Sequence, residues 1–503
     1  MSTDPETLSE HESAAARRID RAYALALWPS VTGHAPIIFL APYLNYATGT
    51  SIALLGLLST VGRVYDALYD PLMGTISDRT PIRFGRRKPW VGIGYAAMLL
   101  VMVLALFAMP QPGDRLSSAW LAVGLFCFFT SWTTAFIPYV AHAGEITTDY
   151  DRRTRINLWQ GVTQIVAGLV VYLVPYLLVD PGAAGFRGGV GAALRSIGVG
   201  LPLADWLTIP RIAGVANYGA VMTVLVWMTI LTLPVIVYRY LRYVPEDRRT
   251  PAAAAGSIAA AFRNRIFRNF SFGYLLLIAG YMGRLSLFPF VVTYATGGQY
   301  SFLLLMLVQN VSGIVATPLW SRIFGRVERT RALMLAVGVE AAGLVALSLA
   351  SSFSALAPLA FVAIGLPGGT LYLLPYLMAG DAADYSRWRQ GIDNRGVHIS
   401  IISMILKLGS VFSSATLWLA GLLGFDPAKG IDDGDLLILK TLGLYLPAGL
   451  IVAGGLVMAR FPINRARHRA IQARLDRRMR PVTEPGREAF EGMTLPERTA
   501  KAS

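Results

Sequence analysis

Apolar runs of roughly 20 residues recur along the whole chain, separated by short polar loops. A helix needs about that length to cross a hydrocarbon core of about 30 Å, and a helix bonds all of its own backbone groups there. A composition of 54% hydrophobic and 15% charged residues also lies outside the range of soluble globular domains. We therefore predict an all-α integral membrane protein with twelve transmembrane helices, at approximately residues 23–47, 51–77, 90–109, 117–143, 156–178, 217–238, 269–295, 299–323, 331–351, 354–380, 396–424 and 437–461.

The positive charges of the chain gather in alternate loops. Arginines and lysines crowd the loops near residues 79–88, 151–155 and 239–268, whereas intervening loops such as 45–51 contain almost none. Such charges stay on the cytoplasmic side of membrane proteins, so we predict that both termini are cytoplasmic. The first 22 residues hold no apolar core, so we expect no cleaved signal peptide and a multi-pass protein of the inner (plasma) membrane.

The apolar runs fall into two groups of six. The longest polar break between them covers residues 239–268, and "SDRTPIRFGRRK" after the second run is echoed by "SRIFGRVERTR" after the eighth. We predict a cytoplasmic segment 1–22, six-helix halves at 23–238 and 269–461 around this connector, and a basic cytoplasmic tail at 462–503. Two six-helix halves related by a parallel repeat are typical of the major facilitator fold.

Three charged residues interrupt the second run near its middle. Arg63, Asp66 and Asp70 are spaced at i, i+3 and i+7, so they lie on one face of the predicted helix. A charge at the centre of a membrane helix costs roughly 2.5 to 3.5 kcal/mol, so each one needs a reason. Two carboxylates one turn apart can together ligate a small cation or share a proton. Alternatively, Arg63 forms an internal ion pair with Asp66 and leaves Asp70 near the inner mouth.

Four further ionisable residues lie well inside other runs. Lys407 of the eleventh run needs an anionic partner, and the acidic pair of the opposite half offers one. Arg284 of the seventh run either pairs within its own half or faces the solute, while we expect Glu340 of the ninth to be structural. His34 of the first run is expected to be a satisfied buried histidine, or else a pore group that responds to pH.

Uncharged amides form a second polar class inside the runs. Gln160 and Gln164 lie one turn apart in the fifth run, and Gln309 and Asn310 are adjacent in the eighth. Amides on facing helices suit polyhydroxylated ligands, although hydrogen bonds between helices account for many such residues. The single cysteine, Cys127, excludes a disulfide or a thiolate metal site.

The segment "DALYDPLMGTISDRTPIRFGRRKPW" resembles the signature of the glycoside-pentoside-hexuronide:cation symporters, a group within the major facilitator superfamily that includes melibiose permease. The segments "IPYVAHAGEITTDYDRRTRIN", "GDAADYSRWRQG" and "SMILKLGS" resemble further parts of that family, so the resemblance covers both halves. It implies a cation site at Asp66 and Asp70 with Thr133 as a further oxygen ligand, and a coupling lysine at Lys407 with a hydroxyl at Ser403. From its own helix, Arg63 can hold Asp66 in place. The resemblance also implies a cytoplasmic gate motif at Asp78, Arg79, Gly85, Arg86 and Arg87.

At the sugar site the chain departs from the family pattern. Melibiose permease has a carboxylate in the first helix where this chain has Ser30, and a second where it has Phe136. A stacking aromatic residue of the family falls on Val140, and an arginine falls near Gln160. The identity of the solute is therefore not carried over, and a galactoside is not expected. The candidate solute contacts are Ser30, His34, Phe136, Val140, Gln160, Gln164, Arg284 and Asn310.

These features predict a transporter rather than an enzyme, because we find no HExxH motif, Walker A loop or Ser/His/Asp set. We expect cation-coupled symport of a glycoside or related small polar solute, with Na⁺ or H⁺ as coupling ion and no cofactor. Alternatives are an anionic or amphipathic solute recognised by Arg284, Phe136 and Val140, or a receptor or scaffold on the same fold. The expected partners are the solute and the lipid bilayer, and we expect a monomer. Loop alternation accounts for the net charge of +15 without nucleic acid.

Overall fold

The computed structural model describes residues 5–80, 85–108, 110, 113–115, 118–146, 150–185, 187, 217–245, 258–296, 300–351, 353, 355–390 and 395–479. Parts of the predicted connector (246–257) and tail (480–503) lie outside the described residues. Within the described ranges the chain is helical and contains no β-strand. In these ranges, eleven helices are long and apolar enough to cross a membrane, or up to twelve when one bent pair is taken as a single span. The predicted all-α membrane fold is confirmed.

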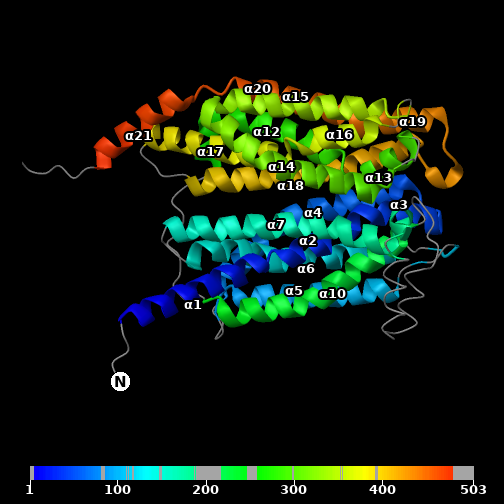
Figure 1. Ribbon diagram of the computed structural model, residues 1–503, viewed down its shortest axis with the longest axis horizontal. Helices are drawn as coiled ribbons and strands as arrows, with labels where there is room; N and C mark the ends of the chain where they lie inside the picture. The colour runs from blue at the N-terminus through cyan, green and yellow to red at the C-terminus, as the bar shows by residue number, and fades with distance from the viewer. Residues whose placement is uncertain are drawn as a thin grey trace, which may run out of the picture.

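The helices form two layers in chain order (Figure 1). The N-terminal layer contains α1 (Pro5–Leu25), α2 (Trp28–His34), α3 (Pro36–Thr48), α4 (Ile52–Arg79), α5 (Lys88–Phe107), α6 (Ser118–Ile146), α7 (Tyr150–Val179) and α10 (Tyr218–Tyr243). The C-terminal layer contains α12 (Arg265–Gly283), α13 (Phe288–Phe290), α14 (Phe302–Arg326), α15 (Arg329–Ser348), α16 (Leu356–Gly365), α17 (Gly368–Gln390), α18 (Arg395–Leu422), α19 (Asp433–Lys440) and α20 (Leu446–Ala459). The short α11 (Ile258–Arg263) precedes α12, and α21 (Arg465–Met479) follows α20.

Several spans are broken where proline or glycine interrupts the helical hydrogen bonds. The first span runs through α1, α2 and α3, and both α2 and α3 carry proline at their first turn. The tenth span, expected at 354–380, divides into α16 and α17 around Pro367 and continues to Gln390. The seventh span bends by 45° between Gly283 and Phe288. The runs were thus located correctly, whereas the breaks inside them were not anticipated.

The two layers meet tightly at the end of the bundle that holds α3, α13 and α19, here called the α19 end (Figure 1). A Cβ atom on Gly421 of α18 would lie 2.1 Å from the backbone nitrogen of Ala53 on α4. A Cβ atom on Gly56 of α4 would lie 2.3 Å from the backbone nitrogen of Trp418. Small residues let membrane helices approach to backbone contact in this way. The α4 and α18 helices therefore close the space between the layers at this end.

Two hydrogen bonds between the layers reinforce the α19 end. The amide of Asn45 on α3 donates to Asp426 beyond α18 at 2.7 Å, and both side chains are buried. The hydroxyl of Ser301, which precedes α14, donates to the carboxylate of Asp180, which follows α7. Each bond joins the N-terminal layer to the C-terminal one, so separation of the layers here would break both.

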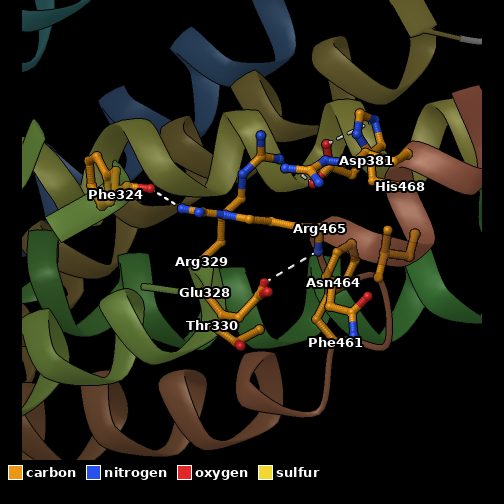
Figure 2. A pocket seen from close by; sticks show the side chains of 11 residues that line it. Phe324, Glu328, Arg329, Thr330, Asp381, Phe461, Asn464, Arg465 and His468 are labelled. Atoms are coloured by element: carbon orange, nitrogen blue, oxygen red, sulfur yellow. Dashed lines mark hydrogen bonds and ion pairs between the residues drawn. The ribbon is translucent and has the colours of Figure 1, made fainter. Parts of the chain in front are cut away.

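At the opposite end, α21 docks on the C-terminal layer. Ile471 and Leu475 of α21 pack against Trp388 and neighbouring apolar side chains. Beside them is a cavity of about 320 Å³, lined by Phe324, Glu328, Arg329, Thr330, Asp381, Phe461, Ile463, Asn464, Arg465, His468 and Arg469 (Figure 2). Within it Asp381 pairs with Arg329 and lies 3.4 Å from His468. The chain after the last span is thus tied back to the helices that precede it.

Candidate cation site and its surroundings

Asp66 and Asp70 lie one turn apart on the face of α4 that meets α6. The hydroxyl of Thr133 on α6 donates a hydrogen bond to Asp66 and lies 3.4 Å from an oxygen of Asp70. Thr133 is fully buried, and Asp66 is only 7% exposed. Two carboxylates and a hydroxyl therefore present several oxygen atoms around one point, and hard cations prefer oxygen ligands.

Lys407 reaches these carboxylates from α18 in the other half of the chain. Its ammonium nitrogen lies 3.2 Å from an oxygen of Asp66 and contacts both carboxylate oxygens of Asp70. Bringing these charges out of water is costly, and their mutual attraction offsets part of that cost. The Lys407 and Asp70 side chains remain 19% and 18% exposed. A cation that arrived at the carboxylates would compete with the ammonium for the same oxygens.

The structure places Arg63 near this cluster. It does not show the ion pair between Arg63 and Asp66 that was one alternative from the sequence. In the described part of the chain the Arg63 guanidinium has no carboxylate within ion-pair distance. Its buried Nε has no hydrogen-bond partner, and the guanidinium carbon lies 6.0 Å from the centre of the Phe129 ring. Asp66 bonds instead with Thr133 and Lys407.

Ser403 lies one helical turn before Lys407 on α18. Its side chain is exposed and makes a hydrogen bond with the hydroxyl of Tyr376 on α17. The resemblance implies a hydroxyl ligand here, and the structure places Ser403 on the helix of the lysine with Tyr376 as its partner. The role of Ser403 in cation binding stays a prediction.

An aromatic group adjoins the ammonium of Lys407. The ammonium lies 5.0 Å from the ring centre of Trp132, close enough for a cation–π contact. Trp132 stacks on Phe136 at 4.6 Å and meets the imidazole of His34 at 4.8 Å. The Nδ1 atom of His34 and the Nε1 atom of Trp132 are both buried without a hydrogen-bond partner. The described residues therefore offer the Nδ1 atom of His34 no hydrogen-bond partner, and the role of His34 stays a prediction.

The other candidate solute contacts lie on α2, α6, α7 and α14. Ser30 shares a hydrogen bond of 3.0 Å with the hydroxyl of Tyr95, and Gln160 donates to Tyr139 at 2.9 Å. The side-chain amide of Asn310 donates to a backbone carbonyl of its own helix. Val140 and Gln164 are exposed. The contacts among the described residues do not join these side chains into one cluster, so their roles stay predictions.

Arg284 pairs with Glu340 inside the C-terminal half. Both side chains have no exposed surface, and Arg284 donates a hydrogen bond to a carboxylate oxygen of Glu340. The rings of Tyr281 and Phe288 lie 4.6 and 5.1 Å from the Arg284 guanidinium carbon. Of the two alternatives for Arg284, these contacts favour pairing within its own half over contact with the solute.

The gate motif lies where α4 ends and α5 begins. Arg87 is buried and forms an ion pair of 2.6 Å with Asp78, and it donates to the hydroxyl of Ser77 at 2.8 Å. Gly85 has a φ of 106°, which side chains rarely adopt, so glycine is required there. Residues 81–84 lie outside the described residues. Arg79 is exposed, and Arg86 is buried.

Sequence reasoning missed some of the contacts around the site. Trp132 was overlooked because an aromatic residue in an apolar run looks like any other packing residue. Asp20, in the segment expected to be polar and cytoplasmic, is fully buried between Arg152 and Arg155 of α7 at 3.0 and 3.1 Å. The signal for that contact was available, because an acid near the first span faces a cluster of arginines in "DRRTR".

Known proteins resemble the chain over a part or over most of its length. An uncharacterized symporter of Synechocystis sp. is 32% identical over 163 residues, which is 31% of this chain and 29% of that protein. The sodium-dependent lysophosphatidylcholine symporter 1-B of Danio rerio is 23% identical over 92% of this chain and 90% of its own. The putative glycoside/cation symporter YagG of Escherichia coli is 22% identical over 88% of this chain and 90% of its own.

A solved structure gives the same fold. The xylose transporter XylE of E. coli, in an inward-open conformation, superposes with a TM-score of 0.55 at 15% identity. The match covers 90% of this chain and 98% of the transporter. The family model described as MFS/sugar transport protein matches residues 26–465, which is most of the chain. The protein therefore belongs to the MFS/sugar transport family, and its fold is that of a transporter rather than an enzyme.

Proposed function

We propose that the protein is a secondary active transporter that couples movement of a glycoside or related small polar solute to a Na⁺ or H⁺ gradient. Transport proceeds by alternating access, with the layers separating first at one end of the bundle and then at the other. Both termini lie in the cytoplasm of a cell whose plasma (inner) membrane holds the protein, in agreement with the alternation of positive loops.

The observation that carries this proposal is the charge cluster of Asp66, Asp70 and Lys407. A buried ion pair is weak evidence for stability, since apolar side chains would do as well. Charges inside a membrane protein more often mark an ion pathway. Here the acids come from one half and the ammonium from the other. Cation binding would release Lys407 from the acids and so change the contact between the halves.

The relatives support coupling to a cation. One is named a putative glycoside/cation symporter and another a sodium-dependent symporter. The oxygen ligands of Asp66, Asp70 and Thr133 suit Na⁺, and the two carboxylates equally offer a site for one proton.

Uptake by membrane vesicles tests the proposal. Vesicles containing the parent protein are screened with labelled glycosides under a Na⁺ gradient and, separately, under a proton gradient. We expect Asp66→Asn and Asp70→Asn each to abolish gradient-driven accumulation, because each removes an anionic ligand. Asp433→Asn, which changes an exposed carboxylate on α19, is the matched control and should accumulate solute like the parent.

The proposal fails if either substituted protein, present in the vesicles at parental amounts, still concentrates the solute as the parent does. Comparison of the two gradients in the parent identifies the coupling ion. A parent that accumulates no glycoside under either gradient would point to another class of solute.

The second candidate is an amphipathic solute. Trp132, Phe136 and His34 form an aromatic group beside Lys407, where Phe136 stands in place of a carboxylate of the sugar carriers. A relative with 92% coverage of this chain is named a lysophosphatidylcholine symporter. Uptake of a labelled lysophospholipid in the same vesicles, in place of glycosides, would favour this candidate.

A further inference from the structure

Arg63 is a half-buried cation on α4. Among the described residues its guanidinium has no carboxylate within ion-pair distance, and its Nε is buried and unbonded. The nearest acid on its helix, Asp66, already bonds with Lys407 and Thr133. A charge held at mid-membrane without a direct ion pair is costly, so this arrangement needs a purpose that packing alone does not supply.

Two further unbonded polar atoms belong to His34 and to Trp132, whose ring lies 5.0 Å from the ammonium of Lys407. The Nδ1 atom of His34 and the Nε1 atom of Trp132 are buried without partners, and their rings are in contact at 4.8 Å. The imidazole of His34 interacts electrostatically with both Arg63 and Lys407. Phe129 lies next to both Arg63 and His34. The centre of its ring is 6.0 Å from the Arg63 guanidinium carbon and 6.1 Å from the centre of the His34 ring. A guanidinium and an indole can only donate, and an imidazole donates from Nδ1 in one tautomer.

The charges of the cluster indicate which kind of solute these hydrogen-bond donors would bind. Two carboxylates, Asp66 and Asp70, are balanced by the two cations Lys407 and Arg63. When a coupling cation joins the carboxylates, the cluster gains one uncompensated positive charge. A solute that carries one negative charge would restore neutrality, and a neutral solute would not. Binding of the cation and of an anionic solute would then strengthen each other, as linkage requires.

We propose that Arg63, His34 and Trp132 form a subsite for a single oxyanion, a carboxylate or a phosphate, of the transported solute. This proposal rests on the proposed cation coupling and narrows the solute to an acidic member of its class. Arg284, the other arginine deep in the membrane, is not available for this role because Glu340 already neutralises it.

The test compares three soluble sugars that share one ring: D-glucuronate with one negative charge, D-glucose 6-phosphate with about two at neutral pH, and uncharged D-glucose. Calorimetry measures their binding to the purified full-length protein in lipid nanodiscs at constant ionic strength. Each sugar is tested with the cation site loaded by Na⁺, loaded by acidic pH, or left unloaded. We expect at least one oxyanion to bind the loaded protein about tenfold more tightly than glucose, within the range of roughly 5- to 150-fold known for linked sites. Comparison of D-glucuronate with D-glucose 6-phosphate shows whether the subsite prefers a carboxylate or a phosphate.

Substitutions at Arg63 then locate the effect. Arg63→Gln should remove the advantage of the oxyanion, measured as the ratio of its affinity to that of glucose in the same variant, whereas Arg63→Lys should keep part of that ratio because the charge remains. Trp132→Phe, which keeps the ring and removes the donor, should weaken oxyanion binding by a few fold.

Two results would overturn the subsite. One is that neither oxyanion binds the loaded parent more tightly than glucose, a comparison that needs no variant. The other is that Arg63→Gln folds and keeps the full preference. The proposed function is tested separately in the same calorimeter, because it requires that the parent bind Na⁺ or a proton and that Asp66→Asn lose this binding. Cation binding without oxyanion preference would therefore reject the subsite and retain the transporter.

Discussion

Closure of the α19 end should depend on two glycines, because no side chain fits between α4 and α18 there. In Gly421→Ala the new Cβ would lie 2.1 Å from the Ala53 nitrogen, and in Gly56→Ala it would lie 2.3 Å from the Trp418 nitrogen. The atoms that it meets belong to the backbone and cannot rotate away, so the helices themselves have to move apart. Overpacking of this kind costs about 1 to 3 kcal/mol. Applied to the closed state alone, that cost lowers its population relative to the open state by roughly 5- to 140-fold.

Pulsed electron resonance between two spin labels measures this shift. Labels at Tyr46 and Leu437, which are exposed on opposite layers near the α19 end, are attached after Cys127 is replaced by serine. We expect both alanine variants to gain a population with a longer separation. Gly449→Ala is the matched control, since nothing lies within 4 Å of the added atom. Distance distributions that superpose on the parent's in both variants would refute the reasoning.

Three other substitutions test separate contacts. Lys407→Gln should keep the fold but lose most of the mutual enhancement of cation and solute affinity, which is about 1 to 3 kcal/mol for linked sites. Solute titrations with and without the cation measure this coupling, and undiminished coupling would contradict the role of Lys407. Arg284→Gln should lower the free energy of unfolding by about 3 to 5 kcal/mol, because Glu340 is left buried and unpaired. Thermal unfolding in detergent measures this loss. The double variant Arg284→Met with Glu340→Leu should recover much of it. Ile471→Asp should release α21 and make its protease cleavage faster, with the exposed site Arg467→Asp as the control.

Much of the fold could be predicted because the bilayer imposes a simple rule on each span. Twelve apolar runs gave the helices, and the spacing of Asp66 and Asp70 fixed their common face, since helical periodicity is local. Lys407 was assigned to them because a buried cation needs an anion, which the acidic pair of the other half offers, and because the family resemblance implies a coupling lysine there. The bend after Gly283 and the break at Pro367 were not predicted, since a long apolar run tolerates either a straight or a broken helix.

Contacts between distant segments could not be predicted from the chain alone. The bond from Asn45 to Asp426 joins residues far apart in sequence, and it exists only because the two layers dock at that end. Arg284 and Glu340 were each noticed, but their pairing depends on how α12 and α15 rotate about their axes. Trp132 gave no signal at all, because its contact with Lys407 depends on the position of α18.

The pair of Arg284 and Glu340 also constrains how the protein is assembled in the membrane. Each residue lies deep in a span, so either helix alone would carry an uncompensated charge into the lipid, at a cost of roughly 2.5 to 3.5 kcal/mol. The span of α12 emerges from the ribosome first, and its partner α15 follows only after α14 has been made. The earlier helix therefore settles fully in the bilayer only when the later one arrives. We therefore expect the first span of the C-terminal half to reach its final depth in the bilayer together with the third.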